Sequence, residues 1–177
     1  MTQFIMIRHG EPTYEIVQSR GFKGLGHDLG QLTLQGREQA YLRALDNELK
    51  DAELIISSPY TRALETAAII SRITGIPLQV ENDLHEWLID TTMAYEIDDY
   101  RKASDEFWQS KGIRSKDTLY PWESIDSVKN RVDKVLEKYL DYKKVIVVCH
   151  GIVINSQTFL GDNLGYCDKR IILKGAK

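Results

Sequence analysis

The chain has 177 residues, of which 42% are hydrophobic and 28% are charged, and its formal net charge at pH 7 is -3. This length suits one domain with a substantial core, and the composition is ordinary for a globular protein. The slight negative charge excludes a general nucleic-acid-binding or anionic-membrane surface, so an anionic ligand would have to be attracted by local positive charge.

The sequence also bears on cellular location. Its first residues contain no basic segment followed by a long apolar run, and no apolar stretch approaches the length of a membrane span. The two cysteines, Cys149 and Cys167, lack a Cys-x-x-Cys spacing and are interpreted as reduced thiols. We therefore expect a cytoplasmic protein that binds neither nucleic acid nor membrane.

The first predicted elements surround a strand that stops abruptly. Residues 3–7 form a short apolar run that ends at a charged pair and a glycine, which is the pattern of a buried strand. Residues 10–30 contain five glycines and show no sustained period, so we expect a long loop over the end of that strand. Thr33 is then expected to cap a helix that extends to about residue 50.

A strand, a helix and a second strand follow in close succession. Residues 53–57 form another apolar run, and Ser58 with the proline after it is typical of a helix start. Gly75 suits the left-handed position just after the end of that helix, and residues 77–80 form a short strand. This alternation predicts a mostly parallel sheet with right-handed crossovers.

Residues 83–122 are less regular and rich in aromatic side chains. A helix is expected between about residues 93 and 110. We expect the whole segment to act as a lid or cap. Aromatic residues of this segment, together with one from the loop at 10–30, have two alternative roles: to line an apolar site for a leaving group, or to form a small core inside the cap. These residues are Tyr14, Trp87, Tyr95, Trp108 and Trp122.

The last third of the chain supplies the remaining elements. Ser124 caps a strongly amphipathic helix, residues 144–149 form a buried strand, a helix runs from residue 152 to near residue 161, and residues 170–173 form a final strand. The chain contains no repeat, low-complexity tract or linker. We therefore predict one α/β domain over residues 1–177, a three-layer α/β/α sandwich with a mostly parallel central sheet.

Two of the apolar runs end in a histidine and a glycine: His9, preceded by Arg8, and His150, followed by Gly151. If these strands are parallel neighbours, both imidazoles meet at one edge of the sheet. Arg62 falls in the first turn of the helix that follows Ser58, where free N–H groups favour anions. Two guanidinium groups and two imidazoles suit phosphoryl transfer, which needs in-line positioning and stabilisation of charge on the non-bridging oxygens.

Each residue also has a simpler interpretation when taken alone. Arg8 and His9 could be surface residues at a strand end, His150 could be a core histidine bonded to backbone, and Arg62 could be an exposed helix arginine paired with Glu65. It is their combination that favours a site. The scattered acidic residues argue against a two-metal phosphatase, which would need clustered carboxylates and histidines.

Four motifs occur in order over nearly the whole chain. They read Arg-His-Gly-Glu at residues 8–11, Leu-Thr-x-x-Gly-x-x-Gln-Ala at 32–40, Ser-Ser-Pro-x-x-Arg-Ala-x-x-Thr-Ala at 57–67, and Val-Val-Cys-His-Gly at 147–151. Jointly they resemble the signatures of the histidine phosphatase (phosphoglycerate mutase-like) superfamily. The resemblance implies a phosphoglycerate mutase-like fold and chemistry that needs neither a metal nor a cofactor.

The resemblance also implies roles for individual residues. His9 would be the nucleophile that becomes phosphohistidine, and Glu86, after the third strand, would donate a proton to the leaving group. The carboxylates of Glu11, Glu81 and Asp90 remain alternatives for that proton donor, and His27 and His85 match no motif position and are interpreted as incidental. The implied catalytic and phosphate-binding residues are Arg8, His9, Arg62, Glu86, His150 and Gly151.

Departures from the family pattern favour one branch of it. Cys149 stands where the family usually has serine, and Pro-Thr-Tyr at residues 12–14 replaces the asparagine and tryptophan typical of mutases. We therefore expect a metal-independent phosphomonoesterase that acts on a small phosphorylated metabolite. Phosphoglycerate mutase-type transfer and a non-catalytic phosphate- or phosphoprotein-binding module are the alternatives, and a homodimer is left open.

Overall fold

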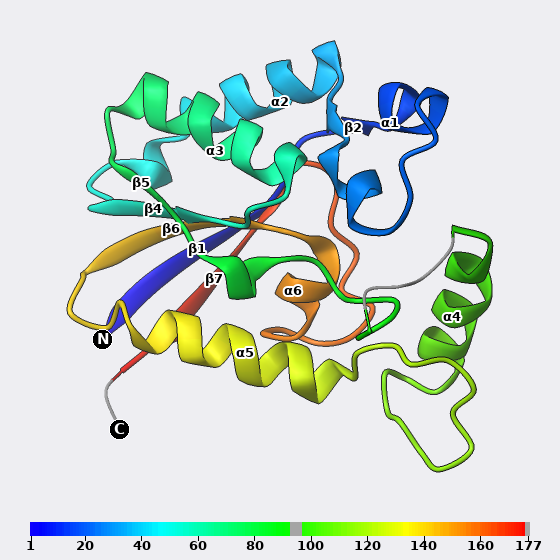
Figure 1. Cartoon of the computed structure of the whole chain (residues 1–177). Coiled ribbons are helices and arrows are strands. Elements are labelled where there is room, and N and C mark those ends of the chain that lie inside the picture. Colours follow the sequence, from blue (N-terminus) through cyan, green and yellow to red (C-terminus); the bar gives the residue numbers. More distant parts are fainter. Residues whose placement is uncertain (93–96, 176–177) are drawn as a thin grey trace.

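The computed structural model describes residues 1–92 and 97–175 (Figure 1). At its centre lies a five-stranded sheet in the order β5-β4-β6-β1-β7. The β4–β5, β4–β6 and β1–β6 pairs are parallel, and β7 is antiparallel to β1. The strands are β1 (Thr2–Arg8), β4 (Leu54–Ser57), β5 (Leu78–Val80), β6 (Lys144–Cys149) and β7 (Lys169–Lys174).

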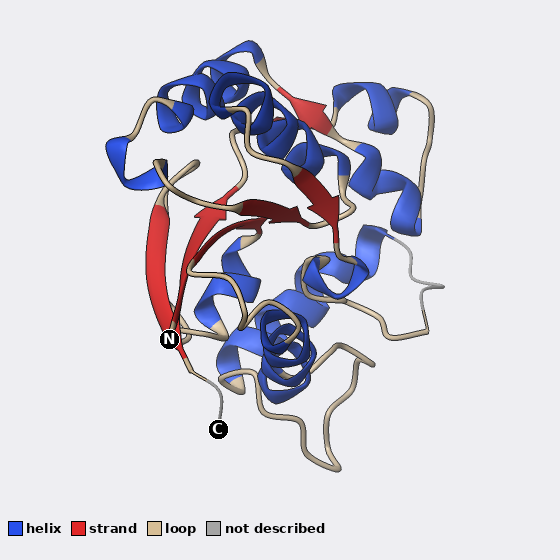
Figure 2. Ribbon diagram, turned by 90° about the vertical axis from the view of Figure 1, so that its left-hand side faces the viewer, coloured by secondary structure: helices blue, strands red, loops and turns tan. Residues whose placement is uncertain are grey.

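Helices cover both faces of this sheet (Figure 2). One layer contains α2 (Leu34–Ala44) and α3 (Thr61–Thr74), and the other contains α5 (Ile125–Glu137) and α6 (Gly151–Asn155). Strand β1 shows why, because its side chains alternate between the two cores. Phe4 packs in the cluster that includes α5 and α6 residues, whereas Ile5 packs in the cluster that includes α2 and α3 residues. This arrangement confirms the predicted three-layer sandwich with a mostly parallel sheet.

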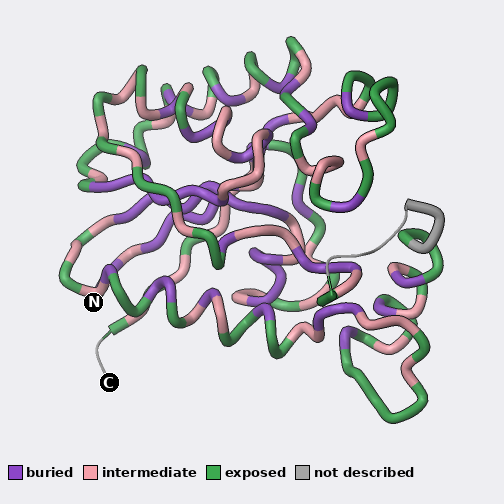
Figure 3. Tube along the Cα trace, in the orientation of Figure 1, coloured by how far each residue is buried: buried purple, intermediate pink, exposed green. Residues whose placement is uncertain are grey.

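The central strands are buried along most of their length, whereas the helices are buried only on their inner sides (Figure 3). This agrees with the apolar runs of the sequence, since a strand covered on both faces reads as continuous apolar residues. No helix in the described ranges is long and apolar enough to cross a bilayer.

Smaller elements lie beyond the end of the sheet to which β1 runs (Figure 1). On one side are β2, α1, η1 and β3, all within or just after the segment expected to be a loop. Helix α4 lies on the other side. Two further 3-10 turns, η2 and η3, lie elsewhere, in the connections between larger elements. These elements are β2 (Pro12–Thr13), α1 (Glu15–Ser19), η1 (Gly24–Leu29), β3 (Gln31–Leu32), η2 (Asn47–Leu49), η3 (Asn82–Leu84) and α4 (Ile97–Gln109).

Several expected boundaries were wrong. The segment 10–30 is not structureless, because β2 pairs with β3 and encloses α1 and η1. The helix expected to reach residue 50 ends at Ala44, since Asp46 adopts extended backbone and its carboxylate caps η2 instead. The helix expected to run to about residue 161 ends at Asn155, whose side chain bonds the backbone of Gly161 and Asp162 and turns the chain back.

The start of α3 also differs from the expectation. The helix begins at Thr61 with Tyr60 as its N-cap residue, rather than at the proline after Ser58. The Ser58 hydroxyl accepts a hydrogen bond from the Tyr60 N–H at 3.2 Å, which makes a local turn, and it also contacts His150. Arg62 is therefore the second residue of the helix, closer to its free N–H groups than expected.

The role of residues 83–122 as a lid stays a prediction. The expected helix is present as α4, although residues 93–96 lie outside the described residues. Phe107 of α4 is fully buried against Trp87 and Trp122, with ring centroids 4.7 and 5.4 Å away. Trp122 is therefore a core residue that ties this segment to the sandwich.

Two glycines allow α2 to approach the turn after β1. A methyl group on Gly10 would lie 2.4 Å from the Gly36 carbonyl oxygen, and one on Gly36 would lie 2.2 Å from the Glu11 carbonyl oxygen. The Thr33 side chain caps α2 by accepting from the Gly36 N–H at 2.9 Å, while the Thr33 N–H bonds the Glu11 carbonyl. The glycines thus set the position of the turn that carries His9.

We expect Gly36→Ala to lower the free energy of unfolding by about 3 kcal/mol, because the added methyl must displace backbone rather than a side chain. Gly75→Ala is the matched control: it has a φ of 74° but open space around the methyl position, so it should cost only about 1 kcal/mol. Urea unfolding followed by tryptophan fluorescence measures both. An equal or smaller loss in Gly36→Ala would show that this close approach does not constrain the fold.

Candidate active site

Strands β1 and β6 bring their terminal histidines together. Their parallel register pairs Arg8 with Cys149, so the next residues, His9 and His150, leave the sheet side by side. The His9 N–H donates to the Cys149 carbonyl at 3.0 Å, and the two imidazole centroids lie 5.2 Å apart, edge to face. Strand β1 ends at Arg8, so the alternation of faces along a strand does not have to hold for residues 8 and 9.

His9 is held as a neutral imidazole of defined tautomer. Its Nδ1 lies 2.8 Å from the Gly10 carbonyl oxygen, and a carbonyl only accepts, so Nδ1 carries the proton and Nε2 keeps its lone pair. Burial, followed by the nearby charges of Arg62 and Arg8, lowers the pKa of His9 to about 3. A neutral imidazole with a free Nε2 is the form that can attack an electrophile.

Two guanidinium groups flank this imidazole from different elements. Arg62 of α3 is 5% exposed, and its Nη1 forms an ion pair with Asp28 of η1 at 3.0 Å. Arg8 donates through Nη1 to the Leu164 carbonyl, and its guanidinium lies 4.6 Å from the ring centroid of Tyr166. These contacts occupy one nitrogen of each guanidinium and hold each group in place.

Three buried side-chain nitrogens within the described ranges have no hydrogen-bond partner: Arg8 Nε, Arg62 Nε and His150 Nδ1. Buried donors are nearly always paired, so unpaired ones call for an explanation. The three come from β1, α3 and the turn after β6, and all belong to residues around His9. Gly151 lies at the same place, since a methyl on it would sit 3.9 Å from Arg8 Nε. An oxyanion would satisfy such a set of donors.

A serine orients the second histidine. His150 Nε2 lies 2.7 Å from the Ser58 hydroxyl, and both residues are fully buried. Burial, followed by the charge of Arg62, lowers the pKa of His150 well below its usual value, so the ring is neutral. The Ser58 hydroxyl accepts from the Tyr60 N–H and still has its own proton to donate to Nε2. In the tautomer in which Ser58 donates to Nε2, His150 carries its proton on Nδ1, the unpaired nitrogen, which can donate to an anion.

A cavity of about 330 Å³ adjoins this group. Glu86 faces it and accepts a hydrogen bond from the Trp87 N–H at 2.8 Å. Burial raises the pKa of Glu86, the direction that a proton donor needs. The residues lining the cavity are Tyr14, His27, Asp28, Arg62, Glu86, Trp87, Ile89, Tyr100, Arg101 and Ile152.

The alternative carboxylates are engaged elsewhere. Glu11 accepts from the Thr33 hydroxyl, Glu81 pairs with Lys138 and Tyr139, and Asp90 caps the turn at residues 91–92. Among the described residues of the cavity wall, Glu86 and Asp28 are the carboxylates, and Asp28 is paired with Arg62. Geometry therefore favours Glu86.

The sequence did not identify several residues of this site. His27, interpreted as incidental, lines the cavity and stacks on Tyr14 with centroids 4.4 Å apart. Asp28 and Ser58 contact Arg62 and His150 directly. The glycine-rich segment 10–30 at a strand end was the one available signal for His27 and Asp28, and a serine before a proline had a simpler interpretation as a helix cap.

The remaining predictions had mixed outcomes. His85 is not part of the described cavity wall, although its Nδ1 lies 2.7 Å from the Glu86 carbonyl. Of the five aromatic residues considered for the leaving-group site, Tyr14 and Trp87 line the cavity. Trp108 is partly exposed beside Phe107, and Tyr95 lies outside the described residues. Arg62 pairs with Asp28, whereas Glu65 pairs with Arg37.

Comparisons with known proteins show which family the chain resembles. Residues 4–165 match the family model of the histidine phosphatase superfamily (branch 1). The chain is 29% identical over 163 residues to "Uncharacterized phosphatase PhoE" of Bacillus subtilis, covering 88% of this chain and 75% of that protein. It is 30% identical over 173 residues to "Putative phosphoserine phosphatase 2" of Hydrogenobacter thermophilus, covering 93% and 81%.

A solved structure shows the same fold. Bacillus stearothermophilus YhfR superposes with a TM-score of 0.74 at 23% identity, covering 98% of this chain and 91% of that chain. The likeness spans the sheet, both helical layers and nearly all of the remaining elements.

The depressed pKa of His9 predicts a loss of stability in acid. Between its usual value of 6.5 and about 3, the unfolded chain binds a proton at this position and the folded chain does not. Stability therefore rises with pH across that window and falls on acidification. In His9→Gln this contribution disappears. The slope of the unfolding free energy against pH should therefore decrease by the amount that corresponds to about one bound proton. Urea unfolding at a series of pH values measures it, and parallel slopes in both proteins would contradict it.

The Ser58 contact predicts an effect on anion binding. In Ser58→Ala, His150 loses the partner that fixes its tautomer, and the inhibition constant of inorganic phosphate should rise about tenfold. Ser57→Ala is the matched control, because Ser57 is equally buried and its hydroxyl donates to the Ser58 carbonyl.

Nitrogen-15 spectra of ring-labelled histidine should show His150 protonated at Nδ1 in the unaltered protein. Protonation at Nε2 would contradict the assignment.

Proposed function

The chain belongs to the histidine phosphatase superfamily, and on that premise we propose that it hydrolyses small phosphomonoesters through a covalent phosphohistidine at His9. The observation that supports this most directly is the set of three unpaired buried nitrogens around a neutral imidazole with a free Nε2. Arg8, Arg62 and His150 would hold the non-bridging oxygens of the phosphate, and Gly151 would let that group approach.

In the first step, Nε2 of His9 attacks phosphorus opposite the ester oxygen. The P–N bond forms as the P–O bond breaks, and Glu86 transfers its proton to the departing oxygen. The positive charge that develops on the imidazole is stabilised by the Gly10 carbonyl, which accepts from Nδ1. The guanidinium groups stabilise the charge on the transferring phosphoryl group, so the step uses no metal.

In the second step, water attacks phosphohistidine. Glu86, now a carboxylate, takes the proton from the water as the P–N bond breaks, which returns His9 to its neutral form and releases inorganic phosphate. The same carboxyl group thus acts as acid and then as base, and the pKa of Glu86, raised by burial, favours the protonated form that the first step needs.

The cavity supports a small substrate with an apolar leaving group. Its volume of about 330 Å³ is at the low end for small-molecule sites, and much of its wall is aromatic or aliphatic. Three residues of this wall, Trp87, Ile89 and Tyr100, come from the segment 83–122. Their position supports the role of this segment as a cap within a single domain of residues 1–177.

The two free cysteines support a cytoplasmic location.

The test is His9→Ala on a panel of phosphorylated metabolites that includes phosphoserine, with free phosphate as the readout. We expect this variant to lose hydrolysis while its circular dichroism spectrum is unchanged. The unaltered enzyme should form an acid-labile phosphoenzyme that His9→Ala does not. His27→Gln is the control: it alters the cavity wall and should still form the phosphoenzyme.

Three results would contradict the proposal. Full hydrolysis by His9→Ala would exclude the phosphohistidine. Isomerisation of 3-phosphoglycerate without release of phosphate would indicate the mutase-type alternative. Phosphopeptide binding without turnover of any metabolite would indicate a binding module.

A further inference from the structure

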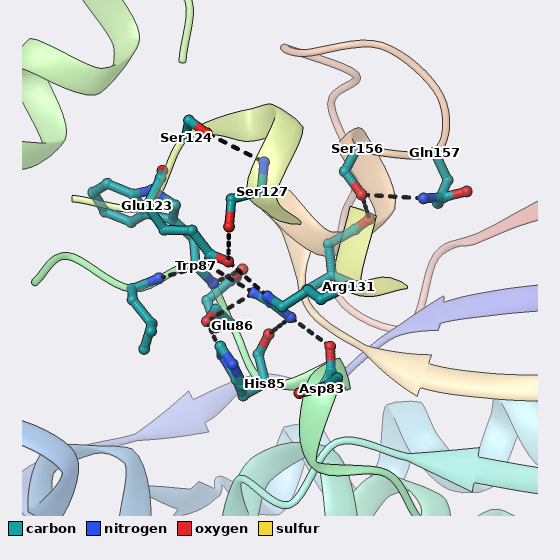
Figure 4. Close-up of polar contacts among 12 residues, drawn as sticks. Asp83, His85, Glu86, Trp87, Glu123, Ser124, Ser127, Arg131, Ser156 and Gln157 are labelled. Atoms are coloured by element: carbon teal, nitrogen blue, oxygen red, sulfur yellow. Dashed lines mark hydrogen bonds and ion pairs between the residues drawn. The ribbon is translucent and has the colours of Figure 1, made fainter. Parts of the chain in front are cut away.

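An ion pair between Arg131 and Glu123 holds the loop that carries Glu86 (Figure 4). Arg131 extends from α5 and binds the Glu123 carboxylate through two nitrogens, with Nε–Oε1 at 2.8 Å and Nη2–Oε2 at 3.0 Å. Their side chains are only 12% and 5% exposed. A bidentate pair this well enclosed has defined geometry.

The rest of the guanidinium is bonded to the backbone around Glu86. Nη1 of Arg131 donates to the carbonyl oxygens of Asp83 and His85, the latter at 2.9 Å, and Nη2 donates to the carbonyl of Glu86 at 3.4 Å. Three carbonyls within four consecutive residues are thus gathered on one side chain. Figure 4 shows the guanidinium pointing into this turn.

Glu123 holds the other side of the same loop. Its carboxylate accepts from the Leu88 N–H at 3.3 Å, its backbone N–H donates to the Leu88 carbonyl at 2.8 Å, and its carbonyl accepts from the Trp87 indole at 2.6 Å. The backbone of Glu86 therefore has fixed neighbours both before and after it, and Glu86 itself lines the cavity.

We propose that Arg131, together with Glu123, is a positioning residue that sets the Glu86 carboxyl for proton transfer to the leaving group. The proposal rests on the proposed function. Arg131 is not among the described residues of the cavity wall, so it acts through the loop backbone rather than on the substrate. Lysine cannot replace it, since a single ammonium lacks the planar set of donors that serves the carboxylate and the carbonyls together.

The proposal has a chemical signature that general loosening lacks. An alkoxide leaving group needs a proton as the P–O bond breaks, whereas p-nitrophenolate departs without one. A misplaced Glu86 should therefore slow the cleavage of alkyl phosphates and largely spare p-nitrophenyl phosphate. The ratio of kcat/KM for the two substrates isolates this step, since kcat/KM does not include the hydrolysis of phosphohistidine.

The first experiment compares Arg131→Lys with the unaltered enzyme. We expect kcat/KM for an alkyl phosphate from the panel to fall about 10- to 100-fold, by analogy with other losses of orienting contacts behind a site. For p-nitrophenyl phosphate the fall should be less than about threefold, since general-acid assistance contributes little there. Lys129→Met is the matched control: it lies on the same helix, pairs with Asp133 on the surface, and should leave both values unchanged.

The second experiment repeats Arg131→Lys in a Glu86→Gln background. If Arg131 acts through the Glu86 carboxyl, the substrate ratio should not change further once that carboxyl is absent. Thermal unfolding curves give the temperature at which each variant begins to unfold, and activity is measured below that temperature. If Arg131→Lys does not fold, Glu123→Gln makes the same comparison with the shape of the side chain retained.

Two outcomes would overturn the proposal. Equal losses for both substrates would show that the ion pair only supports the fold, and a ratio that still changes in the Glu86→Gln background would show that Arg131 acts by another route. Absence of hydrolysis by the unaltered enzyme would instead overturn the proposed function itself.

Discussion

The parallel pairing of β1 with β6 is the constraint on which the site depends. Because the two strands leave the sheet at the same level, residues 141 positions apart in the chain, His9 and His150, have rings 5.2 Å apart. Both strands are covered on both faces and flanked by β4 and β7, so their register is strongly specified. A slip of one residue would exchange the faces of every side chain on the strand.

The electrostatics of the site follow from this placement. Burial, and after it the charges of two nearby guanidinium groups, keep the His9 imidazole neutral, and in the proposed function the same guanidinium groups bind the phosphate. The proposed nucleophile and the proposed anion-binding residues therefore depend on each other. Asp28 takes one nitrogen of Arg62 and leaves Nε unpaired, so its contact orients the guanidinium without using all of its donors.

Three contacts hold the proposed reacting groups, His9, His150 and Glu86, in place. The close approach of Gly10 and Gly36 sets the turn that carries His9, and the Ser58 hydroxyl orients His150. Arg131 on α5 and Glu123, just before α5, hold the loop of Glu86, and neither is among the described residues of the cavity wall. Each of these three residues is thus supported from a different part of the chain, which is the kind of support that the proposed catalytic geometry needs.

The sequence by itself determined the buried strands, the three-layer architecture and the strand-terminal histidines, because each depends on local patterns of apolar residues and on residues adjacent in the chain. The tertiary structure alone decided the ends of the helices, the pairing of Arg62 with Asp28, the inclusion of His27 in the cavity wall and the contacts of Arg131. Ser58 illustrates the physical reason. Its hydroxyl can cap a helix or bond a residue 92 positions away, and only the folded chain sets which partner lies within reach.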